Sequence, residues 1–398
     1  MIYRRFGKTD LQMPVVTCGA MRFQHGWKDV PLAEIPADKQ ANLEACVRRA
    51  LELGINHVET ARGYGSSERQ LGRILPTLPR DKIIVQTKVA PAENADEFVK
   101  QFRDSLERLS LDHVDMLALH GVNDRQVLER SVRPGGCLAA ARRLQREGKC
   151  RFVGFSTHGP TDVILDAVRT DVEGGFDYVN LHWYFIYPVN WPAIAEAARR
   201  DMGVLIISPN DKGGKLYEPP DRLCELTAPM PPMAFNDLFC LSRPQVHTIS
   251  IGVARPKDFD LHVQAAERLA EAEDLMRPIF KRLAAALADA VPEPLRDPLT
   301  AGLPNWEETP GGVNIPIILW LRNLAVAYGM VEYGKMRYNL LGSGGHWFPG
   351  NRADKLDEID LAPALKGHPL ADRVPALLRE AHELLGAEPV KRLSQSES

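Results

Sequence analysis

Four side chains able to exchange or bind protons lie at the ends of three successive apolar segments. Glu59 ends the segment "INHVE", and Tyr64 follows in the loop "TARGYG"; Lys88 ends "IIVQTK" and His120 ends "DMLALH". A buried lysine beside a tyrosine would favour the phenolate and so lower the pKa of the tyrosine. An acid beside that lysine would hold it charged and in place. The residues therefore predict proton transfer by a tyrosine hydroxyl near neutral pH.

The elements that must position these residues alternate along the chain. Each strand candidate is followed by a helical pattern, which predicts a parallel sheet. The strand candidates are residues 13–21, 55–61, 81–91, 113–122, 151–159, 176–184, 203–210 and 246–254. Eight such units match a (β/α)8 TIM barrel, in which chemistry sits at the carboxyl ends of the strands. The alternative is a doubly wound open sheet, but no G-x-G-x-x-G follows a strand, which favours the barrel.

The pattern changes after the eighth unit. We expect the barrel to span residues 1–276 and a helical lobe to span 277–390, with helices around 280–290, 316–340 and 370–385. The polar end, 391–398, is predicted to be disordered.

Composition excludes several classes of function. The 398 residues carry a net charge of −3 with no basic tail, so nucleic acid is a poor partner. No apolar run reaches the length of a membrane span, and the first residues lack a signal-like apolar core, so we expect a cytoplasmic protein. The six cysteines show no metal-binding or redox spacing, so no metal site is predicted.

Three segments resemble the aldo-keto reductase superfamily, and the resemblance covers about residues 1–270. They are "VETARGYGSSERQLG", "IVQTKV" and "DMLALHG". The family's Asp-Tyr-Lys-His tetrad falls by motif on Glu59, Tyr64, Lys88 and His120. The resemblance implies hydride transfer between NADPH and a carbonyl, with Tyr64 as the acid, Lys88 tuning it and His120 orienting the carbonyl. Glu59 is one methylene longer than the family aspartate; we expect activity to be retained, the alternative being poor turnover.

The resemblance also implies cofactor contacts at strand ends and in the loops that follow. The expected cofactor residues are Met21, Ser156, Thr157, Asn180, Ser208, Pro209, Asn210, Gly213, Gly214, Gly252, Arg255 and Lys257. Asn180 stands where the family has a glutamine, and Gly213 and Gly214 permit close approach of phosphate. Arg255 and Lys257 are the cations left near the 2′-phosphate position, which favours NADPH and leaves NADH open. The expected substrate pocket is largely aromatic: Trp27, His158, Trp183, Tyr184 and Trp191.

A second resemblance concerns the lobe. "GAMRF" and the segment from "PGGVNIP" to "KMRYNLL" resemble a bacterial subgroup of aldo-keto reductases with a ferredoxin-like extension that holds iron–sulfur clusters. Cluster ligation needs thiolates, and no cysteine follows Cys240. The sequence therefore predicts a degenerate ferredoxin-like domain without an iron–sulfur cluster.

These features together predict an NADPH-dependent reductase of small aldehydes or ketones, including dicarbonyls. Two alternatives remain at this stage. One is a cofactor-binding sensor or interaction protein with weak or no turnover, and the other is a sugar or alcohol dehydrogenase working in the oxidative direction. A monomer is favoured, although the residues do not decide the oligomeric state.

Overall fold

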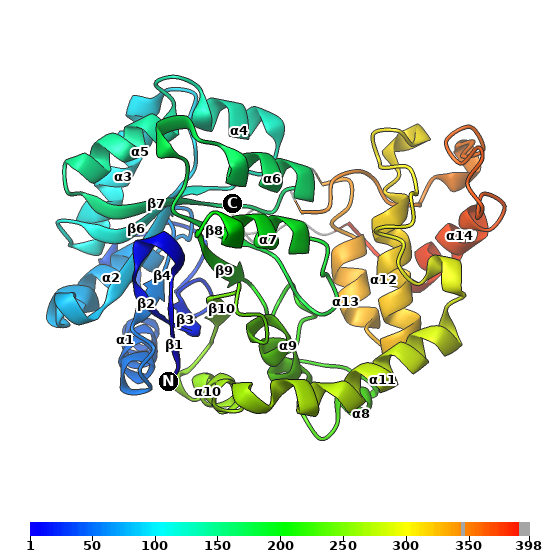
Figure 1. The fold of residues 1–398 in the computed structure, drawn as a ribbon, viewed down its shortest axis with the longest axis horizontal. Helices are drawn as coiled ribbons and strands as arrows, with labels where there is room; N and C mark the ends of the chain where they lie inside the picture. Colours follow the sequence, from blue (N-terminus) through cyan, green and yellow to red (C-terminus); the bar gives the residue numbers. More distant parts are fainter. Residues whose placement is uncertain (344–346, 390–398) are drawn as a thin grey trace. The chain divides into compact units, whose positions relative to one another are not determined.

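Eight parallel strands close into a barrel (Figure 1). The computed structural model describes residues 1–343 and 347–389. In hydrogen-bonding order the strands are β10 (Thr248–Gly252), β3 (Val16–Gly19), β4 (His57–Glu59), β5 (Ile84–Val89), β6 (Val114–His120), β7 (Cys150–Ser156), β8 (Tyr178–Leu181) and β9 (Gly203–Ile207). Seven of the eight predicted strand segments contain one of them completely, and β7 begins one residue before its predicted segment, so the predicted (β/α)8 barrel is confirmed.

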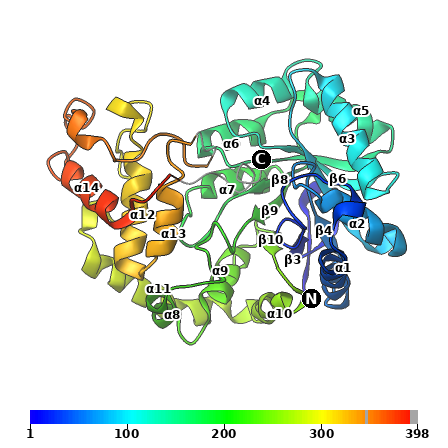
Figure 2. The ribbon, with the colours of Figure 1, turned by 180° about the vertical axis from the view of Figure 1, so that it is seen from behind.

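Helices follow the barrel strands and cover the outside of the sheet (Figures 1 and 2). They are α1 (Ala37–Glu52), α2 (Ser67–Ile74), α3 (Ala95–Leu109), α4 (Arg125–Val132), α5 (Cys137–Arg146), α6 (Thr161–Arg169), α7 (Trp191–Arg199), α9 (Pro232–Leu241) and α10 (Phe259–Glu267). Local sequence sets their ends. Before α3, the side-chain oxygen of Asn94 accepts from the Asp96 amide at 2.9 Å, and Ser110 ends that helix in the left-handed conformation.

A short antiparallel hairpin, which the sequence did not predict, precedes the barrel. It consists of β1 (Tyr3–Arg5) and β2 (Gln12–Pro14), which pair from Tyr3↔Pro14 to Arg5↔Gln12. Three-residue strands carry too little alternation of apolar and polar residues to be recognised.

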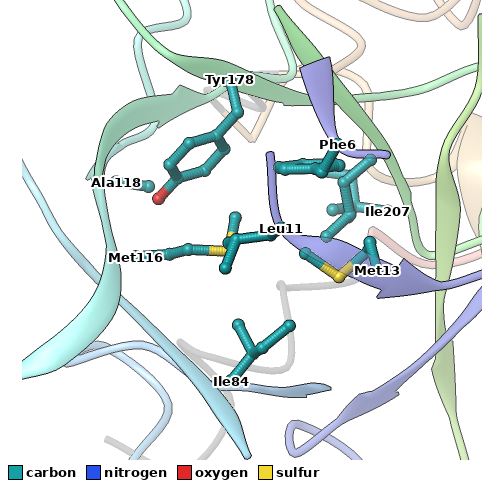
Figure 3. Close-up of a cluster of buried hydrophobic side chains, with 9 residues drawn as sticks. Phe6, Leu11, Met13, Ile84, Met116, Ala118, Tyr178 and Ile207 are labelled. Atoms are coloured by element: carbon teal, nitrogen blue, oxygen red, sulfur yellow. The ribbon is translucent and has the colours of Figure 1, made fainter. Parts of the chain in front are cut away.

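The hairpin supplies apolar side chains to the barrel core (Figure 3). Phe6, Leu11 and Met13 are buried there together with residues of β5, β6, β8 and β9, namely Ile84, Met116, Ala118, Tyr178, Leu205 and Ile207. The rings of Phe6 and Tyr178 lie 5.9 Å apart. A Cβ atom at Gly203 would lie 2.4 Å from the Phe6 ring, so glycine makes room for that ring. This packing keeps water out of that part of the barrel.

The chain divides into two compact units. Among the described residues, the first contains Met1–Gly213 and Asn236–Ala272, and the second contains Gly214–Phe235, 273–343 and 347–389. Residues 214–235, which the sequence placed in the barrel, thus group with the second unit. The predicted domains at 1–276, 277–390 and 391–398 stay predictions, and residues 344–346 and 390–398 lie outside the described part.

The described residues of the second unit form helices and contain no strand. They include α8 (Asp221–Thr227), α11 (Ala272–Ala290), α12 (Ile315–Tyr328), α13 (Val331–Tyr338) and α14 (Val374–Leu385). Gly329 ends α12 with φ of 72°, a left-handed stop. Helices α12 and α14 are joined by the Arg322–Glu380 ion pair at 2.8 Å, and α13 and α14 by a 2.8 Å hydrogen bond between Tyr338 and His382.

Two helices and a set of short turns had no sequence prediction. Helix α4 follows β6 on a short polar stretch that begins at Asp124, whose carboxylate accepts from the Val127 amide at 2.8 Å. Helix α8 lies in the proline-rich segment that was predicted to be a loop. Single 3-10 turns occupy Gly7–Thr9, Leu32–Glu34, Leu75–Thr77, Arg80–Lys82, Val172–Gly174, Pro256–Asp258, Leu269–Glu271, Glu293–Leu295, Pro310–Gly312 and Leu356–Glu358.

Truncation of the hairpin's aromatic side chain tests its role in the core. We expect Phe6→Ala to lower the free energy of unfolding by about 3–5 kcal/mol, because a fully buried ring is lost and a cavity remains. Urea unfolding followed by circular dichroism measures the change. The control is Ile2→Ala, because Ile2 is 39% exposed and should cost no more than about 0.5 kcal/mol. Equal losses in the two variants would contradict the assignment of Phe6 to the core.

Candidate active site

A buried lysine occupies the carboxyl end of β5. Lys88 is 1% exposed, and its ammonium forms an ion pair with Oε1 of Glu59, at the end of β4. The ammonium also donates to the backbone carbonyl of Thr60 at 2.9 Å. Burial lowers the pKa of Lys88 well below its usual value. The charged form of Lys88 therefore depends on the acid and the carbonyl beside it.

Tyr64 lies directly beside this lysine. The Lys88 ammonium is 4.7 Å from the centre of the Tyr64 ring, and the ring packs edge-on to those of His120 at 5.7 Å and Trp27 at 6.2 Å. Gly65 brings the loop in: its φ is +46°, and a Cβ there would lie 2.0 Å from the carbonyl oxygen of Gly26. The structure thus brings all four predicted tetrad residues together, while their catalytic roles stay a prediction.

The expected lowering of the tyrosine pKa is wrong for this structure. Burial raises the pKa of Tyr64 above its usual value, because the phenolate would lose its hydration. Proximity of the lysine does not reverse this effect of burial. The hydroxyl is consequently protonated at neutral pH, the state that a proton donor needs.

Two further rim residues, Ser156 and Asn180, stand beside His120 on neighbouring strands. The register pairs His120 of β6 with Ser156 of β7, and Ser156 with Asn180 of β8. The Ser156 hydroxyl accepts from the Gly121 amide at 3.3 Å. Both amide atoms of Asn180 are buried and have no hydrogen-bond partner among the described residues. A buried unpaired amide is costly, so this pair of donor and acceptor atoms suits a ligand that carries its own amide.

The loop after β9 is held by a buried chain of side-chain contacts that the sequence did not predict. The side chain of Asn210 contacts His262 of α10 at 3.2 Å, and His262 in turn contacts Asp237 of α9. The Asn236 amide donates to the carbonyl of Pro209 at 3.1 Å. A Cβ at Gly213 would lie 1.9 Å from the same carbonyl, so the loop requires glycine there. These contacts position the predicted cofactor residues Ser208, Pro209, Asn210 and Gly213.

A cluster of basic side chains follows β7, β8 and β9. His158 and His182 are joined at 2.7 Å, and the Lys212 ammonium lies 3.0 Å from Nδ1 of His158 and 3.3 Å from Nε2 of His182. His158 had been predicted in the substrate pocket. His182 had not, because a single histidine after an apolar run carries no distinguishing motif; its signal is its place two residues after Asn180, directly after the end of β8.

Other predicted site residues have structural contacts of their own. Thr157 donates to the Val122 carbonyl at 2.7 Å, which ties the loop after β7 to that after β6. Trp183 is 4% exposed and stacks on Phe239 at 4.6 Å, and it also contacts the Trp191 ring at 5.3 Å. Tyr184 is fully buried and donates to the Ile207 carbonyl.

The remaining predicted cofactor residues lie in less enclosed positions. Arg255 and Lys257 are exposed, and Arg255 pairs with Asp258 at 3.4 Å. Met21 and Gly252 are half-buried after β3 and at the end of β10, and Gly214 belongs to the second unit with φ of +134°. The ligand roles of these residues, and of the substrate-pocket residues, stay predictions.

Within residues 1–343 and 347–389, no group of three or more His, Cys, Asp or Glu side chains could hold a metal ion. None of the helices in this part of the chain combines the length and the apolar character needed to cross a membrane.

Comparison with known proteins connects this geometry to a family. The model of the aldo/keto reductase family matches residues 15–209, which include Glu59, Tyr64, Lys88 and His120. This segment is thus similar to the aldo/keto reductase family. The chain is 36% identical over 181 residues to an L-galactose dehydrogenase of Arabidopsis thaliana, a match that covers 42% of this chain and 52% of the relative. It is 27% identical over 187 residues to an L-glyceraldehyde 3-phosphate reductase of Escherichia coli, covering 42% and 49%.

Both relatives are named as oxidoreductases, the class of enzyme that the sequence predicts, and the chain spans about half the length of the curated relatives it matches. Among solved structures, the holo form of an aldo-keto reductase from Bacillus halodurans superimposes with a TM-score of 0.58 at 20% identity, covering 70% of this chain and 96% of that one. This likeness supports the barrel fold. The predicted ferredoxin-like nature of the second unit has no support in these matches and stays a prediction.

Removal of the acid from the buried pair tests the coupling of Glu59 to Lys88. We expect Glu59→Gln to lower the free energy of unfolding by about 3–5 kcal/mol at pH 7, because the ammonium loses its counter-charge. We expect the pKa of Lys88 to fall further in this variant, so the folded variant binds fewer protons than the folded natural protein at pH values up to the pKa that Lys88 has in the natural protein. The deficit should therefore shrink as the pH rises toward that value.

Urea unfolding at pH 7 and at an alkaline pH measures both effects. The control is Asp201→Asn, which breaks the exposed pair with Arg5 and should cost at most about 1 kcal/mol. A deficit in Glu59→Gln that is small, or that does not change with pH, would mean that Lys88 does not need the acid.

Proposed function

We propose that this protein reduces a small carbonyl compound to an alcohol with a nicotinamide cofactor, NADPH in preference to NADH. The cofactor, when bound, supplies the hydride that the carbonyl carbon receives. Tyr64 donates its hydroxyl proton to the carbonyl oxygen as negative charge develops there. The observation that carries the proposal is the continuous series of contacts from Glu59 through Lys88 and Tyr64 to His120, at the carboxyl ends of β4, β5 and β6 and in the loop after β4.

Each residue of the series has a separate role. Tyr64 is a protonated phenol at neutral pH and so a proton donor. Lys88, held by Glu59 and the Thr60 carbonyl, places positive charge beside the phenol and stabilises the phenolate that remains after proton transfer. His120, which packs against the Tyr64 ring, orients the carbonyl in this proposal.

The cofactor proposal is supported by the fit of residues along the rim. The unpaired amide of Asn180 offers both a donor and an acceptor to the carboxamide of a nicotinamide ring. Ser156, beside it in the register, offers a hydroxyl. The loop from Ser208 to Gly213 brings backbone close to the same rim, which suits a pyrophosphate.

The oxidative direction is a second candidate because one relative is named as an L-galactose dehydrogenase and another as an L-glyceraldehyde 3-phosphate reductase. The same residues serve both directions, since a tyrosine that gives a proton in reduction takes one in oxidation. An assay of aldehydes, dicarbonyls and a triose phosphate with NADPH, and of aldose sugars with NADP⁺, separates them. Binding of cofactor without turnover on either panel would favour a sensor instead.

Replacement of the proton donor tests the proposed chemistry. We expect Tyr64→Phe to lower kcat for carbonyl reduction by about 10²–10⁴-fold, because the general acid is lost while the ring remains. The affinity for NADPH should change less than about twofold. Steady-state rates from NADPH absorbance and a fluorescence titration measure the two quantities. Tyr3→Phe is the control, because the Tyr3 hydroxyl bonds only to the Gly54 carbonyl among the described residues. A Tyr64→Phe enzyme with full rate would refute the assignment.

Replacement of the rim amide tests the cofactor contact. We expect Asn180→Leu to weaken NADPH binding by about 5- to 100-fold, because a carboxamide would lose its partners without a large change of volume. Asn180→Gln keeps the amide and should stay within about threefold of the natural protein. Titration of NADPH fluorescence measures both. Equal affinity in all three proteins would remove Asn180 from the cofactor site.

A further inference from the structure

The acid of the buried pair has a second partner on the last strand of the barrel. The hydroxyl of Ser250, on β10, donates to Oε2 of Glu59 at 2.7 Å, while Oε1 of the same carboxylate faces Lys88. Ser250 is 6% exposed and Glu59 is 4% exposed, so water does not compete for this hydrogen bond. Both carboxylate oxygens are therefore committed to partners from different strands.

The strand between these two partners leaves space for the contact. β3 separates β10 from β4 in the barrel, and Gly19 of β3 is in register with Glu59. A Cβ at Gly19 would lie 2.7 Å from the Ser250 hydroxyl and 3.5 Å from Oε2 of Glu59. The lack of a side chain at Gly19 thus lets the hydroxyl of Ser250 reach past β3 to the carboxylate.

We propose that Ser250 is a positioning residue for proton transfer, which fixes the Glu59 carboxylate so that its other oxygen holds Lys88 beside Tyr64. A glutamate has one more rotatable bond than an aspartate, so its carboxylate has more orientations to choose from. A hydrogen bond from a buried hydroxyl to a charged oxygen is strong enough to select one of them. Ser250 acts through Glu59 and Lys88 and makes no contact with Tyr64 among the described interactions.

This proposal rests on the proposed reductase function, and its test compares Ser250→Ala in two backgrounds. In the natural protein we expect kcat at saturating NADPH and aldehyde to fall about tenfold or more, with KM and NADPH affinity within about twofold. In the Glu59→Gln background the same change should alter kcat by less than about twofold, because the acid through which Ser250 acts is gone. Ser131→Ala, a buried serine of α4 that donates to the Val127 carbonyl, is the control and should keep full rate.

Two results would overturn the proposal. One is a kcat of Ser250→Ala within twofold of that of the natural protein, and the other is an equal loss of kcat on Ser250→Ala in the natural and Glu59→Gln backgrounds. Ser250→Cys keeps a weaker donor of similar size and should give an intermediate loss; it also serves if the alanine variant does not fold.

If the natural protein reduces no carbonyl, the proposed function fails and Ser250 is judged by unfolding instead. Urea unfolding at pH 7 compares the cost of Ser250→Ala in the natural protein and in the Glu59→Gln background. The cost should be larger in the natural protein, because a hydrogen bond to a charged carboxylate is stronger than one to a neutral amide. Equal costs in the two backgrounds would overturn the proposal independently of turnover.

Discussion

The burial of one ammonium group sets the requirements for the whole site. Lys88 is almost completely removed from water, and a buried charge is tolerated only with a counter-charge and further hydrogen-bond partners. The ion pair with Glu59 and the hydrogen bond to the Thr60 carbonyl meet this requirement. The ring of Tyr64 lies over the same group, so the placement of the phenol follows from the placement of the lysine. Displacement of the acid would therefore disturb every other member of the series.

The barrel interior combines apolar and polar side chains. Phe6, Met13 and Met116 belong to an apolar cluster in the interior, whereas His120, Ser156 and Asn180 stand in register at the strand ends. Buried polar side chains also meet inside the barrel, where Thr17 contacts both His57 and Thr248 at 2.8 Å. Burial lowers the pKa of His57 to about 3, so that imidazole adds no charge near Lys88 at neutral pH. The counter-charge of the Glu59 carboxylate is thus the Lys88 ammonium.

The sequence was sufficient for the barrel and for the four residues of the tetrad motif, because long alternating patterns and strand-end positions are local properties. It did not predict partners that depend on closure of the sheet. Ser250 and His262 are single polar residues in apolar surroundings, and only the fold shows that they meet Glu59 and Asp237. The sequence near Ser250 offered one clue. Thr248, two residues earlier on the same strand, is also polar, and side chains two residues apart on a strand point to the same face. The Tyr64 pKa was mispredicted for a related reason, since burial is a property of the assembled rim.

The longer acid at position 59 is accommodated by partners on both sides of its strand. β5 lies on one side of β4 and supplies Lys88, and β10 lies beyond β3 on the other side and supplies Ser250. Glu59 and Ser250 are 191 positions apart in the chain, so their hydrogen bond can form only after β10 has closed the barrel against β3. Until then the carboxylate lacks its second partner. The geometry of the lysine and the phenol is consequently complete only in the closed barrel, and the last strand becomes part of the site without contributing a residue that touches the phenol.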